Sequence, residues 1–252
     1  MKILNLGCGT RTSSSPCVIN IDWSIYLRIK RSVILNGLAP ALLRGDRLVR
    51  YKSLPENIMV HNLARGIPFA TNSVDVVYHS NMLEHLDKEI AEEFLSEALR
   101  VLKPGGIHRI VVPDFEMACK TYVSHIALAE VDPTEAAKHD SYIARIIEQS
   151  VRRDAAGTRL QKPIRRRLEN IIIGNARRRG ETHQWMYDRI NLAALLRMTG
   201  YVEPRLMSFK TSLVEAWGSL GLDFDHTGIE FQPGSFYMEA KKPISSRSAD
   251  PQ

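Results

Sequence analysis

The sequence predicts an α/β fold built on a doubly wound, mostly parallel sheet. Through residue 113, short apolar runs alternate with helical patterns, the order expected when helices connect parallel strands. The first apolar run also ends in a turn with two glycines, which is typical of ligand-binding α/β proteins. With 252 residues and 44% hydrophobic content, the chain can bury a full core. One domain with an elaboration is therefore expected rather than an array of domains.

The first expected strand, residues 3–6, leads directly into the turn Gly7-Cys8-Gly9. Glycine allows positive φ and lets the backbone come close to a ligand. A strand that ends in Gly-x-Gly can therefore hold its amides against a ribose or a phosphate. By itself the motif fits a tight turn after a buried strand equally well.

The second expected strand, residues 18–22, ends in Asp22. An acid at the tip of the strand beside a glycine turn can accept hydrogen bonds from ribose hydroxyls. A nicotinamide-dependent oxidoreductase is a rival with the same elements. Its fingerprint requires a third glycine that opens a helix and an acid about twenty residues further on. Here Asp22 follows Gly9 by only 13 residues (22 − 9) across a serine-rich segment, which disfavours this rival.

Residues 23–57 are expected to form an insertion that covers the site. Its start, residues 23–30, is amphipathic, and its later part is expected to be loop-like around Pro40 and Pro55. A third strand is predicted for residues 58–61.

The next stretch contains the clearest alternation of strand and helix. Residues 74–78 are almost continuously apolar, as in a strand buried on both faces. Residues 89–101 have helical spacing, and residues 103–106 (Lys-Pro-Gly-Gly) are expected to end that helix. A strand is predicted for residues 107–112.

The remainder of the chain is predicted to contain a helical lid and the last two strands. Residues 115–180 are helical and polar in pattern, too long for an ordinary connection within such a sheet. A helix over 190–198 ends at Gly200, and strands follow at 201–209 and 234–241. The expected division is a core at 1–114, an arginine-rich lid at 115–182, a return to the core sheet at 183–244 and a flexible tail at 245–252.

Charge and cysteine content indicate the partners and the compartment. The net charge of +6 is concentrated in three arginine clusters, at residues 152–153, 165–167 and 177–179. These fit phosphate binding and a solvated helix face equally well. The three cysteines lack disulfide or zinc spacing, and no long apolar segment is present. We therefore expect a cytoplasmic protein with reduced thiols and no membrane span.

Five stretches carry a family resemblance. They are Leu4-Asn5-Leu6-Gly7-Cys8-Gly9, Asn20-Ile21-Asp22, Asp75-Val76-Val77-Tyr78, Leu83-Glu84-His85-Leu86 and Leu102-Lys103-Pro104-Gly105-Gly106. In order and spacing they resemble the class I S-adenosylmethionine-dependent methyltransferases, nearest to the small-molecule type 11 group. The resemblance implies a Rossmann-like, seven-stranded methyltransferase fold and S-adenosyl-L-methionine as the cofactor.

The resemblance also implies a set of cofactor-binding residues. The glycine turn would hold the methionine and ribose part, the acid after the second strand would bind the ribose hydroxyls, an amide-leucine pair would lie beside the adenine, and the turn after the fourth strand would lie near the methyl group. These residues are Gly7, Cys8, Gly9, Asp22, Asn62, Leu63, His79 and Ser80.

Two departures from the family pattern concern the cofactor and a metal. Asn5 stands where many members have an acid, and no third glycine follows Gly9, so the contact to the cofactor's amino group is expected to be weaker or water-mediated. Some relatives hold a divalent ion with a Glu three residues before a Glu-His pair. Here Asn81 occupies that position, leaving only Glu84 and His85, so we expect a metal-independent site.

Catalytic candidates follow from the chemistry of methyl transfer. The donor is already activated, so the enzyme mainly aligns the reacting atoms, but a hydroxyl acceptor needs a base. The candidates are His85 and His183, with Asp114 as an acceptor-binding residue at the end of the fifth strand. A direct pair between Glu84 and His85 is not expected, since neighbours on a helix do not face each other.

Residues 183–188 (His-Gln-Trp-Met-Tyr-Asp) resemble a stretch found in methyltransferase-like proteins of sugar and glycan gene clusters. This would direct His183 and Trp185 toward the methyl donor; alternatively, Trp185 and Tyr187 anchor the lid. The predicted function is methyl transfer to a hydroxyl of a sugar, glycan precursor or secondary metabolite that bears a phosphate or carboxylate. An RNA methyltransferase and a non-catalytic binding protein are the alternatives. Nucleic acid is disfavoured because few aromatic residues are interleaved with the basic ones.

Overall fold

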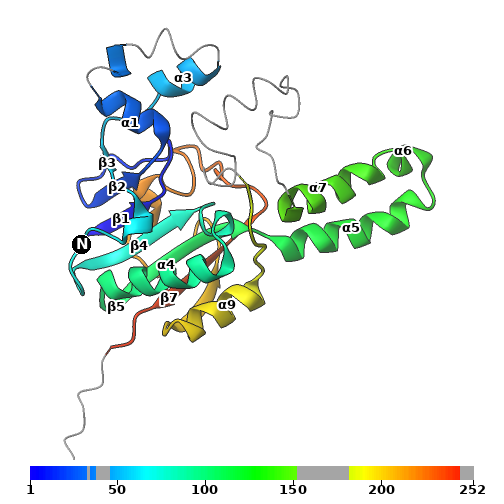
Figure 1. The fold of residues 1–252 in the computed structure, drawn as a ribbon. Coiled ribbons are helices and arrows are strands. Elements are labelled where there is room, and N and C mark those ends of the chain that lie inside the picture. The colour runs from blue at the N-terminus through cyan, green and yellow to red at the C-terminus, as the bar shows by residue number, and fades with distance from the viewer. Residues whose placement is uncertain (33–34, 38–45, 152–181, 245–252) are drawn as a thin grey trace, which may run out of the picture.

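The computed structural model describes residues 1–32, 35–37, 46–151 and 182–244, with a seven-stranded sheet at its centre (Figure 1). The strand order is β3-β2-β1-β4-β5-β7-β6. Strands β1 to β5 pair in parallel, and β7 runs antiparallel to both β5 and β6. The strands are β1 (Ile3–Leu6), β2 (Val18–Asp22), β3 (Ile58–Val60), β4 (Val74–Ser80), β5 (Leu102–Pro113), β6 (Val202–Met207) and β7 (Ser235–Lys241). This confirms the predicted Rossmann-like methyltransferase fold.

The centre of the sheet determines where a site can form. Strand β1 is buried along its whole length and lies between β2 and β4. Leu6, at its carboxyl end, pairs with Ile21 of β2 and with His79 of β4. The residues that follow these three strands therefore meet at one edge of the sheet, where ligands collect in open α/β folds.

Helices α4 (Lys88–Val101) and α9 (Arg189–Met198) cover one face of the sheet. The buried side of α4 repeats at helical spacing, which is why this segment forms an amphipathic helix; its members are Ala91, Phe94, Leu95, Ala98 and Val101. Helix α9 begins with a capping box between Asp188 and Asn191. It ends just before Gly200, whose positive φ of 97° stops the helix as predicted.

The opposite face is covered by the segment that joins β6 to β7, including the short 3-10 helix η4 (Trp217–Leu220). Beneath it lies the fully buried guanidinium of Arg109, on β5. Arg109 forms ion pairs with Asp223 at 2.8 Å and with Glu239 at 2.5 Å. This face therefore combines apolar packing with an internal charge cluster.

Two expectations for loops were wrong. The later part of the insertion contains a helix, α3 (Asp46–Lys52), in addition to α1 (Ile25–Arg31). Tyr51 of α3 packs with Leu27 of α1 and Cys8 of the glycine turn, so tertiary burial stabilises a helix that the sequence pattern did not reveal. Helix α4 ends just before the Lys-Pro-Gly-Gly stretch, as predicted, but this stretch already belongs to β5, which was expected to begin only at residue 107. It forms an irregular part of the strand, since the register passes from Val74–Leu102 to Val76–Ile107.

A helical hairpin follows β5 and extends away from the sheet (Figure 1). It consists of α5 (Phe115–Ala129), α6 (Pro133–Ala136) and α7 (His139–Val151). The helical pattern predicted after residue 114 is confirmed over these residues. The three arginine clusters and the C-terminal tail lie outside the described residues.

Among the described residues, no helix is long and apolar enough to cross a membrane. The three cysteines, Cys8, Cys17 and Cys119, are free thiols.

Candidate active site

The glycine turn after β1 has two positions with different constraints. Gly7 and Gly9 both have positive φ, 63° and 53°. A Cβ on Gly7 would lie 2.6 Å from the sulfur of Met82, whereas nothing lies within 4 Å of a Cβ on Gly9. The backbone at Gly9 therefore borders open space, as a cofactor-binding turn requires. Between them the Cys8 thiol is buried, and burial together with the nearby Asp22 raises its pKa, so it is not a reactive thiol.

Asp22, at the end of β2, ties its own loop to the glycine turn. Its Oδ2 accepts a hydrogen bond from the Gly9 amide at 2.8 Å, and its Oδ1 accepts one from the Ser24 amide at 2.8 Å. Each carboxylate oxygen can accept a second hydrogen bond. The position therefore remains suited to the predicted contact with ribose hydroxyls.

Asn5 has a structural role that the sequence did not predict. Its buried Nδ2 donates to the Arg11 carbonyl at 2.8 Å and to Asn20 Oδ1 at 3.0 Å. Asn20 Oδ1 also accepts from the Ser13 amide at 3.2 Å. A carboxylate at position 5 could not donate either hydrogen bond. The amide therefore organises the loop after the glycine turn, which explains the departure from the family pattern.

Asn62 and Leu63 follow β3, as expected for residues beside the adenine. Asn62 caps the short 3-10 helix η1 (Leu63–Arg65), and its Oδ1 accepts from the Ala64 amide at 3.1 Å. One lone pair of this oxygen is thus already used in the cap. Its second lone pair and the Nδ2 hydrogens are the groups left for a base.

The end of β4 places His79 and Ser80 differently from the prediction. Both residues belong to the strand rather than to the turn after it. The His79 imidazole is fully buried and lies edge-on to Phe94 and His108, with ring centroids 5.3 and 5.1 Å away. Burial lowers the pKa of His79 to about 3. Its side chain belongs to the packing under α4, so only its backbone is available to a cofactor.

The short 3-10 helix η2 (Leu83–His85) brings Glu84 and His85 together with His183, 98 residues later (183 − 85). The rings of His85 and His183 have centroids 4.8 Å apart. One donor atom from each of the three residues lies within 4.8 Å of the others. His85 Nε2 is 3.8 Å from Glu84 Oε1, since η2 is a tight 3-10 turn, but this distance is too long for the direct hydrogen bond that was not expected between these neighbours.

Electrostatics in this cluster favour the neutral forms of Glu84 and His85. Burial raises the pKa of Glu84 to about 8. Burial, helped by the charge of His183, lowers the pKa of His85 to about 4. Both shifts follow from the cost of a charge away from water. The cluster lies beside the glycine turn, since Met82 contacts Gly7 and its carbonyl accepts a hydrogen bond from the His85 amide at 3.1 Å.

Residues 4–110 match a family model described as a methyltransferase domain. They include the glycine turn, Asp22, Glu84 and His85, but not His183. Over these residues the chain forms a class I S-adenosylmethionine-dependent methyltransferase domain. S-adenosyl-L-methionine is its cofactor. A search of curated proteins found no match to the chain.

Solved structures of S-adenosylmethionine-dependent methyltransferases are similar to the chain. One from Archaeoglobus fulgidus has a TM-score of 0.43 and 14% identity, covering 96% of this chain and 86% of that one. One from Thermotoga maritima has a TM-score of 0.42 and 15% identity, covering 96% of this chain and 82% of that one. One from Aquifex aeolicus has a TM-score of 0.41 and 15% identity, covering 96% of this chain and 81% of that one. With TM-scores this low, they add no argument to the assignment, which rests on the sequence match.

Tyr187 lies near Glu84 of the cluster, and Asp114 lies near Tyr187 in turn. Tyr187 is buried, and its hydroxyl has no hydrogen-bond partner among the described residues. Burial and the nearby Glu84 raise its pKa. Asp114 caps α5, with Oδ1 accepting from the Met117 amide at 3.0 Å, and the next residue's amide donates to the Tyr187 carbonyl at 3.1 Å. The sequence did not include Glu84 or Tyr187 in the site, although both stand inside motifs that it singled out.

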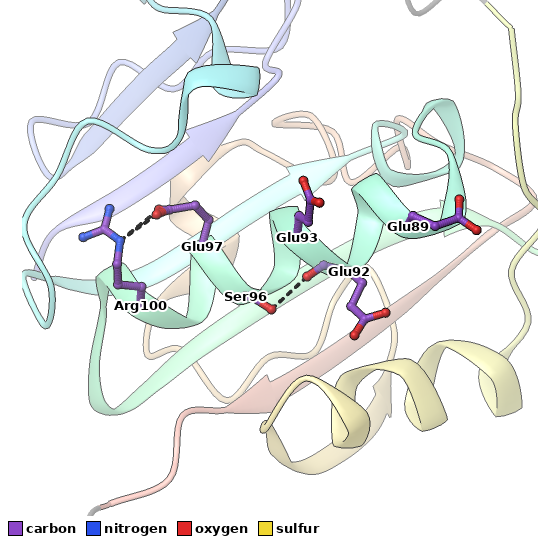
Figure 2. A pocket seen from close by; sticks show the side chains of 6 residues that line it. All are labelled: Glu89, Glu92, Glu93, Ser96, Glu97 and Arg100. Atoms are coloured by element: carbon purple, nitrogen blue, oxygen red, sulfur yellow. Dashed lines mark hydrogen bonds and ion pairs between the residues drawn. The ribbon is translucent and has the colours of Figure 1, made fainter.

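The methyltransferase has a separate surface hollow of about 630 Å³ on the outer side of α4 (Figure 2). It is lined by Glu89, Glu92, Glu93, Ser96, Glu97 and Arg100. Arg100 already pairs with Glu97 at 2.7 Å. All six residues belong to the solvent-facing side of one helix, α4. We therefore assign this hollow no part in cofactor binding.

Proposed function

We propose that the methyltransferase transfers the methyl group to a hydroxyl oxygen of a small molecule, such as a sugar, a glycan precursor or a secondary metabolite. The observation that carries this proposal is the pairing of His85 and His183 beside the glycine turn, with ring centroids 4.8 Å apart. An amine acceptor can lose its proton late, whereas a hydroxyl needs a group that withdraws its proton during attack.

The hydrogen bonds of His85 support this role. Its Nδ1 lies 3.2 Å from the Thr182 carbonyl, which can only accept, so Nδ1 carries the proton. Nε2 is therefore the nitrogen with the lone pair. Because the pKa of His85 is lowered to about 4, this lone pair is present at neutral pH. A hydroxyl can donate to it and direct an oxygen lone pair toward the methyl group.

The test measures methyl transfer from labelled S-adenosylmethionine to a panel of sugar and phenolic hydroxyls, with amines as the comparison. We expect His85→Ala and His183→Ala to lower hydroxyl methylation by roughly 10²–10⁴-fold. Binding of S-adenosylmethionine, followed by calorimetry, should change little. His139→Gln, on the helical hairpin, is the control and should retain activity. Turnover of amines alone, or full hydroxyl methylation by both alanine variants, would contradict the proposal.

The acceptor class is tested separately by salt. A small acceptor, even one with a phosphate or carboxylate, should bind with a shallow salt dependence. Binding of RNA would weaken steeply, because neutralised phosphates release counterions. A steep salt dependence of turnover on RNA would replace the small-molecule proposal. The free thiols of all three cysteines are consistent with our proposal that the reaction takes place in the cytoplasm.

A further inference from the structure

We propose that Glu84, His85 and His183 bind a divalent transition-metal ion. The three residues come from two segments far apart in the sequence, and each presents one donor atom to a common space. The proposed role of the ion in methyl transfer rests on the proposed function, but the binding site itself does not.

The first argument is that His85 Nε2 and Glu84 Oε1 lie close to each other with no hydrogen bond between them. His85 donates Nδ1–H to the Thr182 carbonyl, so its Nε2 lone pair points toward Glu84 Oε1, 3.8 Å away. At that distance no direct hydrogen bond joins them. A histidine that donates one nitrogen to a backbone carbonyl and presents the other to an acid has the arrangement of a metal ligand.

The second argument is the lack of compensation at Glu84. Its carboxyl group is almost fully buried, and neither oxygen has a hydrogen-bond partner among the described residues. Placing a carboxylate away from water costs several kcal/mol unless a partner offsets it. A cation held between this group and two imidazoles would provide that partner.

The third argument is that backbone hydrogen bonds hold the two segments in position. The amides of Gln184 and Trp185 donate to the Glu84 carbonyl at 2.7 and 3.3 Å. Gln184 Nε2 in turn donates to the Thr182 carbonyl at 3.0 Å. The residues on either side of His183 are therefore fixed against η2, which reduces the ordering needed to bind an ion.

The donor set indicates the class of metal. Two imidazole nitrogens and one carboxylate oxygen suit Zn²⁺, Mn²⁺, Fe²⁺ or Co²⁺ better than the all-oxygen preference of Ca²⁺. Asn81 supported the expectation of a metal-free site, but its Nδ2 donates to Gln232 Oε1 at 3.1 Å and it does not belong to the cluster. The third donor is instead His183, which sequence spacing could not reveal.

Three protein ligands leave a coordination position for the acceptor hydroxyl. Coordination would lower the pKa of that hydroxyl, as it does for metal-bound water. The hydroxyl proton leaves to solvent, the oxygen forms the new C–O bond, and the methyl–sulfur bond breaks with its electron pair remaining on sulfur. The products are the methyl ether and S-adenosylhomocysteine. In this scheme the histidines act on the acceptor through the ion rather than as bases.

The experiment compares metal binding by the full chain and two matched variants, Glu84→Gln and Glu93→Gln. Glu93 is exposed on α4, so its variant controls for the loss of one negative charge. Protein stripped with a chelator is titrated with Zn²⁺ by calorimetry and with Co²⁺ by visible absorption. We expect one ion per chain in the wild type and in Glu93→Gln. In Glu84→Gln the affinity for the metal should fall by at least roughly 10–100-fold, because even the loss of a residue that only contacts a metal ligand costs that much.

A second readout keeps the result independent of catalysis. Saturating Zn²⁺ should raise the Tm of the wild type and of Glu93→Gln by mass action, but not that of Glu84→Gln. Equal binding by the wild type and Glu84→Gln would overturn the metal site. If the metal binds but no hydroxyl is methylated, the proposed function fails alone. If chelated protein methylates hydroxyls at the full rate, the role of the ion fails while the proposed function stands.

Discussion

Among the described residues, the buried acids Asp223 and Glu239 differ from the buried acid Glu84 in the partners that offset their burial. On one face of the sheet, Asp223 and Glu239 both pair with Arg109. Further donors satisfy them: Trp217 Nε1 and the Tyr78 hydroxyl for Asp223, and the Leu213 amide and Ser212 hydroxyl for Glu239. At the carboxyl edge, Glu84 has no hydrogen bond to either oxygen among the described residues.

The difference separates a structural charge cluster from a binding site. Buried charges persist when paired and hydrogen-bonded, and the Arg109 cluster meets that requirement within the chain itself. Glu84 does not meet it, yet two histidines face it. An acid left without compensation beside potential ligands indicates that the compensating group comes from outside the chain. The predictions below test whether these two groups differ in this way.

The largest effect is expected for Arg109→Met. The substitution leaves two buried carboxylates without their shared cation. The free energy of unfolding, measured by urea denaturation, should fall by roughly 3–5 kcal/mol. A loss below 1 kcal/mol would mean that the Arg109 cluster is not the internally compensated one, and the comparison would fail.

Glu239→Gln and Glu84→Gln form a matched pair. The new amide at position 239 would turn a donor toward the Ser212 hydroxyl or the Leu213 amide and would weaken the pair with Arg109. We expect a loss of about 2–3 kcal/mol. Glu84→Gln should leave stability unchanged to within about 1 kcal/mol when both proteins are measured in chelator, because a buried carboxyl group that its raised pKa keeps neutral is replaced by an amide of similar shape. Equal losses in the two variants would contradict the comparison.

His79 tests whether a buried polar side chain without a hydrogen-bond partner is by itself a sign of a binding site. Both of its ring nitrogens are buried without hydrogen bonds among the described residues, but it lies in the core against Phe94 and His108. Burial lowers the pKa of His79 to about 3 and that of His108 well below its usual value, so the unfolded chain binds more protons than the folded one below pH 6.5. Stability should therefore fall as the pH drops from 6.5 toward 3.

His79→Phe should reduce that acid dependence, seen as a smaller fall in Tm between pH 6.5 and pH 4. At pH 7 it should change stability by about 1 kcal/mol or less, since an apolar ring replaces an unpaired polar one. Methyl transfer should persist. If this variant folds but no longer binds the cofactor, the His79 side chain contributes to cofactor binding, contrary to its burial in the core.

The smallest effect is expected for Tyr187→Phe. The Tyr187 hydroxyl is buried without a partner, so its removal should change the free energy of unfolding by less than about 1 kcal/mol. Metal binding should be retained, because the hydroxyl is not one of the three donors. A loss of Zn²⁺ affinity as large as that in Glu84→Gln would show that Tyr187 also contributes to the metal site.

The sequence by itself determined the sheet and the location of the site. Apolar runs buried on both faces, a helical stripe over 89–101 and turn residues with positive φ are local signals, and they predicted the seven strands, α4 and α9. The glycine turn and Asp22 followed from the same logic, since the carboxyl ends of neighbouring parallel strands must meet. Helix α3 was not predicted, because burial against α1 stabilises it rather than its own sequence pattern.

Only the tertiary structure decided what the individual side chains do. His79 faces the core because the pleat of β4 alternates its residues between the two faces of the sheet. Asn5 holds a loop because Asn20 and Arg11 lie within its reach. Glu84, His85 and His183 form a cluster because backbone hydrogen bonds join residues nearly one hundred positions apart. Such contacts depend on long-range packing, which no local pattern of residues encodes.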